Sequence, residues 1–232
     1  MQFIEKNSFS VRSAVYCLKK DGSALEFVIF PMVHVGSPQF YDEVSRRLES
    51  CDLILAEGVK SKRVKLLTRS YRIVKHIRRI GLVTQQDGMR VEALRAKILN
   101  ADIDAGAFDD SWSSLSLWLR AQLFVLIPIW VLYLLLFGTR EVLADNLALD
   151  DLPSQEEILE EDEDFAPLHT LLIDGRDRIL LEQVAKLLNQ NQHARRIAIV
   201  FGAEHMRNAM KFLMQSHKYY VAKAEWVTVF DL

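Results

Sequence analysis

Cysteine is scarce in this sequence of 232 residues, which contains only Cys17 and Cys51 and no C-x-x-C pair. Two such residues are too few for a disulfide framework, and they lack the spacing of a redox or zinc motif. Both are expected to be small, buried hydrophobic side chains. The N-terminal segment also lacks an apolar core followed by a small-residue cleavage site, so we expect no secretory signal and an intracellular protein.

Signatures of several well-known reactions are missing as well. The chain contains no G-x-S-x-G, no G-x-x-x-x-G-K-[ST] and no G-x-G-x-x-G motif. It therefore lacks the nucleophile elbow of α/β-hydrolases, the phosphate loop of P-loop enzymes and the glycine-rich turn of dinucleotide-binding enzymes. The formal net charge of −2 gives no electrostatic reason to expect nucleic acid as a partner.

A strand–helix–strand pattern is present at residues 25–58. Two apolar runs, residues 28–30 and 53–56, flank a helical pattern and end close to His34 and Glu57. Strands joined by a packed helix are normally parallel, so their carboxyl ends lie at one edge of the sheet. Ligands of open α/β sheets bind beyond that edge, which makes His34 and Glu57 candidates for chemistry.

The same arrangement returns near the end of the chain. The apolar run at residues 197–201 is followed by Glu204 and His205, by a helical pattern and by a strand-like segment at residues 220–230. The sequence thus predicts an α/β fold with a mixed sheet, built from two similar halves of strand, His-containing loop, helix and strand. Two such halves can face one cleft.

Local signals predict further elements. An Asp-Gly pair at residues 21–22 favours a tight turn between strand-like segments at 10–18 and 25–30, which predicts a β-hairpin. Ser37 precedes a proline, and this order is typical of the start of a helix. Residues 91–99 are predicted to form a helix as well.

Two aspartates follow that segment, Asp102 and Asp104. Either carboxylate could complete a metal shell, because hard divalent ions favour carboxylate and imidazole ligands together. The commoner role of such residues is to cap the next helix or to bind backbone amides, and both readings stay open.

The chain is predicted to consist of one α/β domain, residues 1–110 and 166–232, with an insertion at residues 111–165. The insertion contains an apolar segment at 115–138, whose uninterrupted run is longer than most core helices and shorter than most membrane-spanning ones. We expect this segment to bind a membrane surface or a second copy of the chain.

Two charged segments accompany it. Residues 60–79 carry nine Lys or Arg and no acid, so they either lie on anionic lipid head groups or form a solvated helical face. Residues 145–164 are strongly acidic and are expected to be mobile and to face solvent. The first reading of the basic segment predicts a location at the cytoplasmic face of a membrane.

Topology links the apolar segment to the candidate site. A single membrane crossing at residues 115–138 would place His34 and Glu57 on one side of the bilayer and His205 on the other. A shared site therefore requires the segment to enter and leave from the same face, either by turning near Pro128 or by packing against the domain or a second copy.

Four short motifs resemble those of the TraB/PrgY/GumN family, which is related to the TIKI metalloproteases. They are His34-Val35-Gly36, Ala56-Glu57-Gly58, Gly175-Arg176-Asp177 and Gly202-Ala203-Glu204-His205. The resemblance covers the chain except roughly residues 111–165. It implies that His34, Glu57 and His205 hold a divalent metal ion and a catalytic water, with Arg176 as the basic residue of the family. The sequence departs from the family at Pro31, where the first G-x-x-H motif has glycine.

This resemblance implies a metal-dependent hydrolase, most plausibly a peptidase, with Mn, Co or Zn as its metal. Two His and one Glu are a ligand set suited to a hydrolytic metal with an open position for water. Arg176 is expected to stabilise developing negative charge or to pair with a surface carboxylate. Glu204 is expected to act as a general base or to support His205. The ligand atoms should converge about 2.0–2.3 Å from one centre.

Two alternatives stay open. The chain is either a non-catalytic module at a membrane that binds a peptide or a partner protein through the same cleft, or an esterase in which His34 and Glu57 form a metal-free acid/base pair.

Overall fold

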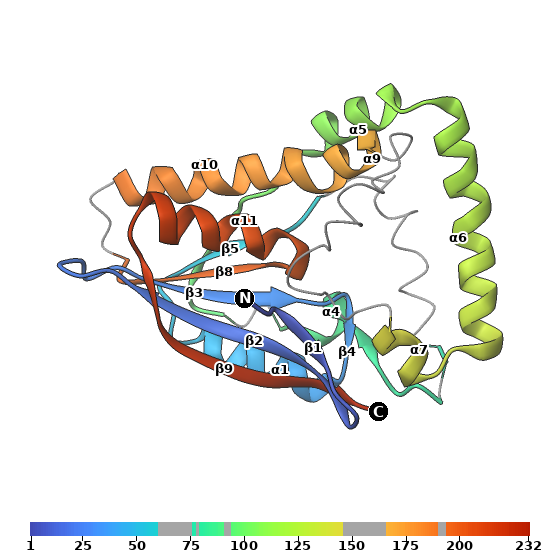
Figure 1. The fold of residues 1–232 in the computed structure, drawn as a ribbon, viewed down its shortest axis with the longest axis horizontal. Helices are drawn as coiled ribbons and strands as arrows, with labels where there is room; N and C mark the ends of the chain where they lie inside the picture. Colours follow the sequence, from blue (N-terminus) through green and yellow to red (C-terminus); the bar gives the residue numbers. More distant parts are fainter. Residues whose placement is uncertain (60–75, 78, 91–93, 146–165, 190–193) are drawn as a thin grey trace.

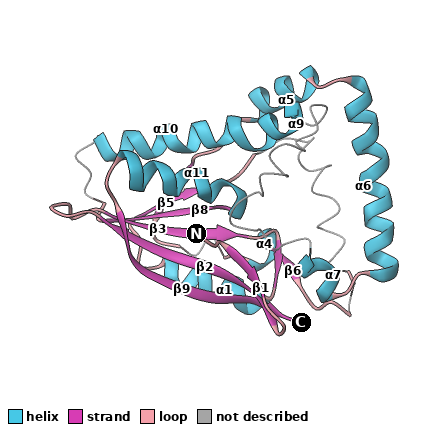
Figure 2. Cartoon of the chain, viewed as in Figure 1, coloured by secondary structure: helices cyan, strands magenta, loops and turns pink. Residues whose placement is uncertain are grey.

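The computed structural model describes residues 1–59, 76–77, 79–90, 94–145, 166–189 and 194–232. The predicted basic segment at 60–79 lies mostly outside these residues, and the acidic segment at 145–164 lies outside them except for its first residue. The described part is a mixed α/β structure with one large sheet, as the sequence predicts, and helices cover both faces of that sheet (Figures 1 and 2).

The large sheet contains seven strands in the part of the chain that is described: β1 (Ile4–Lys6), β2 (Ser10–Lys19), β3 (Glu26–Met32), β5 (Leu53–Ala56), β7 (Lys97–Asn100), β8 (Arg196–Gly202) and β9 (Tyr220–Asp231). β9 pairs with one edge of β2, whereas β1 and β3 share the other edge. β3, β8, β5 and β7 then follow in this order and run parallel to one another. The late strand β8 therefore lies between two early strands.

Local sequence signals explain the first half of the sheet. β2 and β3 form the predicted antiparallel hairpin, and Gly22 adopts a φ of +74° in its turn, a conformation that glycine tolerates best. Helix α1 (Pro38–Leu48) begins as predicted, because the hydroxyl of Ser37 accepts a hydrogen bond of 3.1 Å from the backbone N–H of Phe40.

The prediction of a helix at residues 91–99 is wrong for its described part. Lys97–Asn100 is strand β7, and Lys97 lies opposite Leu53 in the parallel pairing with β5. A helix this short gains little stability by itself, whereas pairing with an existing strand gives the segment backbone hydrogen bonds and a packed face.

The remaining elements are short except for two helices. They are β4 (Val35–Gly36), β6 (Val83–Thr84), α4 (Gln85–Gly88), α5 (Ala105–Ser114), α6 (Leu117–Phe137), α7 (Arg140–Asp145), α9 (Ala166–His169), α10 (Gly175–Asn189) and α11 (Met206–Lys211). β4 and β6 form a separate two-stranded sheet. Figure 1 shows α10 and α11 on one side of the large sheet and α1 on the other, with α6 standing apart from these layers.

Buried apolar side chains form two clusters. The larger cluster fills both faces of the sheet, and the smaller one joins α5 and the start of α6 to Leu171. Cys51 is buried, whereas Cys17 is half-buried, and neither forms a disulfide. The predicted burial therefore holds fully for Cys51 and partly for Cys17.

The apolar segment of the insertion forms the long helix α6. This helix continues through Pro128, so the chain does not turn back there. β7 precedes α6 and β8 follows it, and both strands belong to the large sheet. The segments before and after α6 therefore belong to the same sheet, as a site shared by the two halves requires.

Candidate functional site

The carboxyl ends of β3, β5 and β8 bring three predicted residues to the same edge of the sheet. His34 follows β3, Glu57 follows β5 directly, and His205 closes the 3-10 turn Ala203–His205 after β8. The middle strand of the three is β8, so the Glu57 and His34 loops flank the loop that carries His205.

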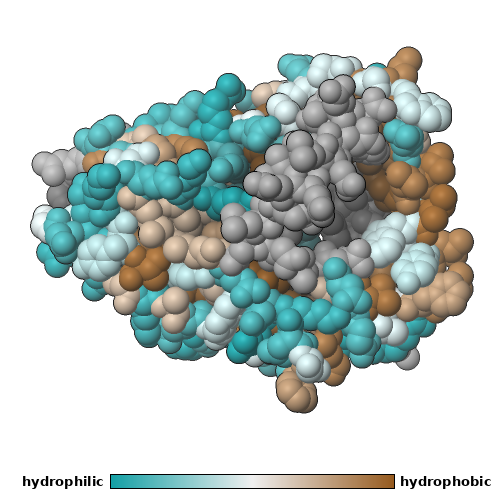
Figure 3. Space-filling view, viewed as in Figure 1, coloured by the Kyte–Doolittle hydropathy of each residue, from teal (hydrophilic) through white to brown (hydrophobic). Residues whose placement is uncertain are grey.

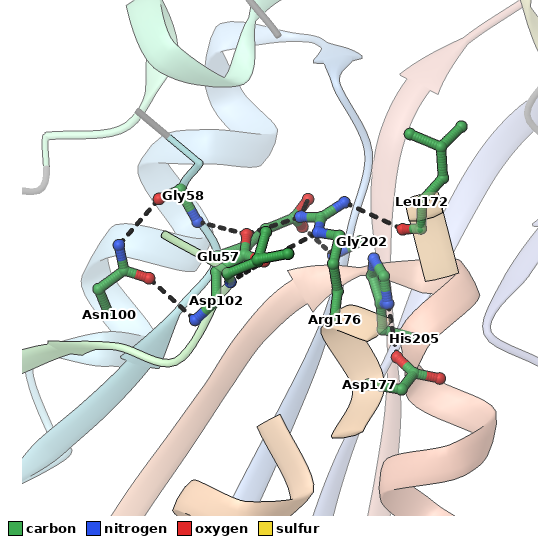
Figure 4. Close-up of polar contacts among 10 residues, drawn as sticks. Glu57, Gly58, Asn100, Asp102, Leu172, Arg176, Asp177, Gly202 and His205 are labelled. Atoms are coloured by element: carbon green, nitrogen blue, oxygen red, sulfur yellow. Dashed lines mark hydrogen bonds and ion pairs between the residues drawn. The ribbon is translucent and has the colours of Figure 1, made fainter. Parts of the chain in front are cut away.

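Glu57 is held by two donors. One carboxylate oxygen, Oε2, accepts a hydrogen bond of 2.6 Å from the backbone N–H of Gly202, and the other forms an ion pair with Arg176 (Figure 4). The side chain of Glu57 is only 14% exposed. Burial by itself raises the pKa of this carboxyl, but the positive charge of Arg176 and the influence of His34 and His205 outweigh it, so the pKa lies below its usual value.

Arg176 lies between two carboxylates. Its Nε and Nη2 atoms donate to Asp102 at 2.8 and 2.7 Å, Nη2 also pairs with Glu57, and Nη1 donates to the carbonyl of Leu172 at 3.3 Å. Burial tends to lower the pKa of the guanidinium, but its hydrogen bonds and charge attraction to Asp102 and Glu57 raise it. Arg176 thus has buried partners and not the surface carboxylate that one reading of the sequence allowed.

Asp102 belongs to the candidate site more closely than its place in the sequence indicated. Its side chain is fully buried and accepts hydrogen bonds from Arg176, from the backbone N–H of Gly58 at 3.0 Å and from that of Ile103 at 2.8 Å. The amide of Asn100 donates to the carbonyl of Gly58 at 2.8 Å, which ties the end of β7 to the loop after β5. A correct assignment of β7 would have placed Asn100 and Asp102 at the same sheet edge as Glu57.

Asp104 caps helix α5. Its carboxylate accepts a hydrogen bond of 2.9 Å from the backbone N–H of Ala107. Asp104 therefore caps a helix, and Asp102 binds backbone amides. Of the two roles left open for these residues, this is the commoner one.

His205 is buried and held by a carboxylate. Its Nδ1 atom lies 2.6 Å from Oδ1 of Asp177, and the amide of Asn208 donates to the other oxygen of Asp177. His205 and Asp177 are 3% and 4% exposed. The contact fixes the orientation of the ring and leaves Nε2 as the ring nitrogen for a ligand.

Gly202, the last residue of β8, allows Glu57 and His205 to border one space. A Cβ atom at Gly202 would lie 3.3 Å from Oε2 of Glu57 and 3.5 Å from Cδ2 of His205. The two side chains therefore approach the same point from opposite loops.

His34 has an exposed surface at the same edge, and the backbone N–H of Gln85 donates to its carbonyl at 2.9 Å. Although its side chain is exposed, enough protein surrounds it for the loss of water to lower the pKa of its imidazole, which the charge of Glu57 opposes in part. Glu204 is also exposed, and within the described part of the chain no hydrogen bond or ion pair joins it to Glu57, Arg176 or His205.

These shifts predict a pH dependence. A group whose pKa is lower in the folded than in the unfolded state stabilises the fold above its unfolded pKa, and this contribution is lost as the pH falls through the folded value. As the pH drops below 6.5, the usual pKa of His, the free energy of unfolding is expected to decrease because of His34. It is expected to decrease further below pH 4.5 because of Glu57. Urea unfolding of the wild type and of His34→Gln measures this. The variant should lose the pH dependence between about pH 7 and pH 5, and an unchanged dependence would contradict the assignment.

The predicted convergence of His34, Glu57 and His205 on one centre is not seen in the structure. Among the described residues, no three His, Cys, Asp or Glu side chains gather closely enough to hold a metal ion. The chemistry of His34, Glu57 and His205 nevertheless suits a metal ion. A lowered pKa keeps His34 neutral and Glu57 ionised near neutral pH, and these are the forms that bind metals.

No protein-family model matches the chain, and no curated protein or solved structure does either.

Proposed function

We propose that the chain is a metal-dependent hydrolase whose site lies at the carboxyl edge of the sheet, with His34, Glu57 and His205 as the residues that would hold a divalent ion. The observation that carries this proposal is the buried contact of 2.6 Å between Asp177 and Nδ1 of His205. Histidines that bind metals usually donate their other ring N–H to a carboxylate, which sets the tautomer and makes the ligand more basic.

The ion, proposed to be Mn, Co or Zn, would supply a Lewis acid and a water of lowered pKa. The residues of the chain supply orientation. Gly202 and Arg176 fix the two oxygens of Glu57. Glu204 is exposed beside His205 and remains the candidate general base. A peptide bond remains the proposed substrate, in line with the family resemblance.

The contacts of Arg176 lead us to propose a different role for it from the one that the sequence suggested. Asp102 and Glu57 together carry more negative charge than the guanidinium carries positive charge. Little of its charge is left to stabilise a negative charge on a substrate. We therefore assign Arg176 to positioning Glu57.

The proposed site also rests on the two similar halves that the sequence predicts. β3 and β8 are adjacent parallel strands, and each is followed by a His-containing loop and a helix, α1 after β3 and α11 after β8. This likeness supports the proposal that two similar halves face one site.

Elemental analysis of the purified chain tests the proposal. The wild type is expected to contain about one transition-metal ion per chain, and His34→Ala and His205→Ala are expected to lose most of it, because each removes one of three protein ligands. His169→Ala is the matched control, since this exposed histidine lies on α9 beside Asp174. Circular dichroism checks that each variant remains folded.

A metal-free wild type, or full metal content in both site variants, would overturn the proposal. The first result favours a non-catalytic, membrane-associated module or a metal-free pair of His34 and Glu57. The module has one observation in its favour, the exposed apolar helix α6.

A further inference from the structure

Helix α6 carries most of the exposed large hydrophobic side chains of the described structure. Eleven of the sixteen exposed large hydrophobic side chains belong to it, and they are Leu117, Trp118, Phe124, Val125, Leu126, Ile129, Leu132, Tyr133, Leu135, Leu136 and Phe137. By length and composition α6 is able to cross a membrane, and only 11% of its apolar window is buried, which distinguishes it from a core helix. Figure 3 shows the corresponding hydrophobic surface along the edge of the molecule where Figure 1 places α6.

Both ends of α6 are attached to the domain. Near its start, the buried Leu119 packs in the smaller apolar cluster with α5. Near its end, the buried Leu134 belongs to the main core. Arg79 donates to the carbonyls of Gly138 and Leu135 at 2.7 and 2.9 Å. A helix held at both ends by one domain cannot cross a bilayer from one side to the other while these contacts persist.

The exposed side chains surround much of the helix. Residues 124–126 and 135–137 are exposed at three consecutive positions each. Consecutive residues of an α-helix are about 100° apart, so each triplet covers about half of the circumference or more. A partner helix from a second copy covers one stripe and leaves the other apolar positions in water. The acyl chains of a bilayer can cover the whole arc that faces away from the domain, which is wider than one stripe, so the pattern favours lipid.

The distribution of charged residues in and around α6 also favours lipid as the partner. Residues 111–139 contain no Asp or Glu, and their single charged side chain is Arg120. Arg140, at the start of α7, donates to the carbonyls of Ile80 and Asp231, so Arg120 is the basic side chain that α6 itself offers to a head group. Trp118 is exposed near Arg120 in the sequence. Arg and Trp are favoured at the head-group layer of a bilayer, where anionic phosphates and partial hydration suit them.

We propose that α6 binds a lipid bilayer lengthwise, with its exposed face among the acyl chains and both of its ends on the same side. This inference depends on α6 alone and holds whether or not the chain is a hydrolase. The carboxyl end of β3 points toward the side of the molecule where α6 stands, so a bound bilayer would lie on the side of the candidate site (Figure 1).

Vesicle flotation of the full chain tests the proposal. The probes are phosphatidylcholine vesicles and vesicles that also contain phosphatidylglycerol. The wild type is expected to float with both, and more strongly with the anionic ones. The double variant Leu126→Glu/Ile129→Glu is expected to bind about 100-fold less tightly or weaker, because each buried apolar side chain contributes about tenfold or more in affinity. Tyr220→Glu is the matched control, because Tyr220 is 45% exposed and pairs with Lys19 at the end of β2 that lies away from α6 (Figure 1).

Circular dichroism and thermal unfolding verify that the double variant is folded. The proposal is overturned if the wild type does not float, or if the double variant floats as the wild type does. It is also overturned if binding occurs only with anionic vesicles and the double variant binds them as tightly as the wild type. Protease added outside the vesicles should remove tags from both termini. Protection of either tag would indicate a crossing, and a lipid-free dimer that the double variant dissociates would identify a second copy as the partner, so both results contradict the proposal.

Discussion

Replacing Asp102 with alanine is expected to lower the free energy of unfolding by about 3–5 kcal/mol, because breaking a buried ion pair leaves its partner charge uncompensated. Arg176 would keep only one of its two carboxylates, and the backbone N–H of Gly58 would lose its acceptor. Urea unfolding measures this difference. Asp104→Ala is the matched control, since it removes a nearby carboxylate whose role is an exposed helix cap worth about 1 kcal/mol.

A double-mutant cycle separates the ion pair from other effects of the substitution. If the cost comes from an unpaired guanidinium, Arg176→Met should add much less destabilisation to Asp102→Ala than to the wild type. Additive effects, or a loss at Asp102 no larger than at Asp104, would contradict the network.

Replacing Asp177 with asparagine is expected to weaken metal binding by about 10–100-fold, the usual effect of losing the carboxylate that orients a histidine ligand. Asparagine keeps the size of the side chain but removes the charge beside Nδ1 of His205. Metal titration of the chelator-treated protein measures the affinity without an assay of catalysis. Asp174→Asn is the control, because Asp174 is exposed and precedes α10 by one residue.

An unchanged metal affinity in Asp177→Asn would assign Asp177 a structural role only. A structural role predicts instead a lower unfolding temperature with normal affinity, since Asp177 is buried and also accepts a hydrogen bond from Asn208.

Local patterns predicted much of the fold, because those patterns reflect local causes. Ser37 and the following proline define the start of α1, and the Asp-Gly pair at 21–22 defines the hairpin. The apolar runs before Glu57 and His205 read correctly as buried parallel strands. β7 was missed because its four residues have an exposed or half-buried face, and it is a strand only through pairing with β5.

The network of the site was less predictable for the same reason. Glu57, Arg176 and His205 were singled out, but the contacts of Arg176 with Asp102 join residues 74 positions apart in the chain. No spacing rule marks such a pair. Asp102 comes close to Arg176 and Glu57 because β7 pairs with β5, and this pairing cannot be read from local sequence.

The position of β8 also has a consequence for how the chain folds. During synthesis, β3 and β5 emerge early, but residues 196–202, which separate them in the sheet, emerge more than a hundred residues later. Until then both strands present unpaired backbone groups that invite pairing with other chains. Contacts this distant in sequence are associated with slow folding and with intermediates that aggregate. A chaperone would therefore have most effect before β8 emerges, while β3 and β5 are still unpaired on the side that β8 later occupies.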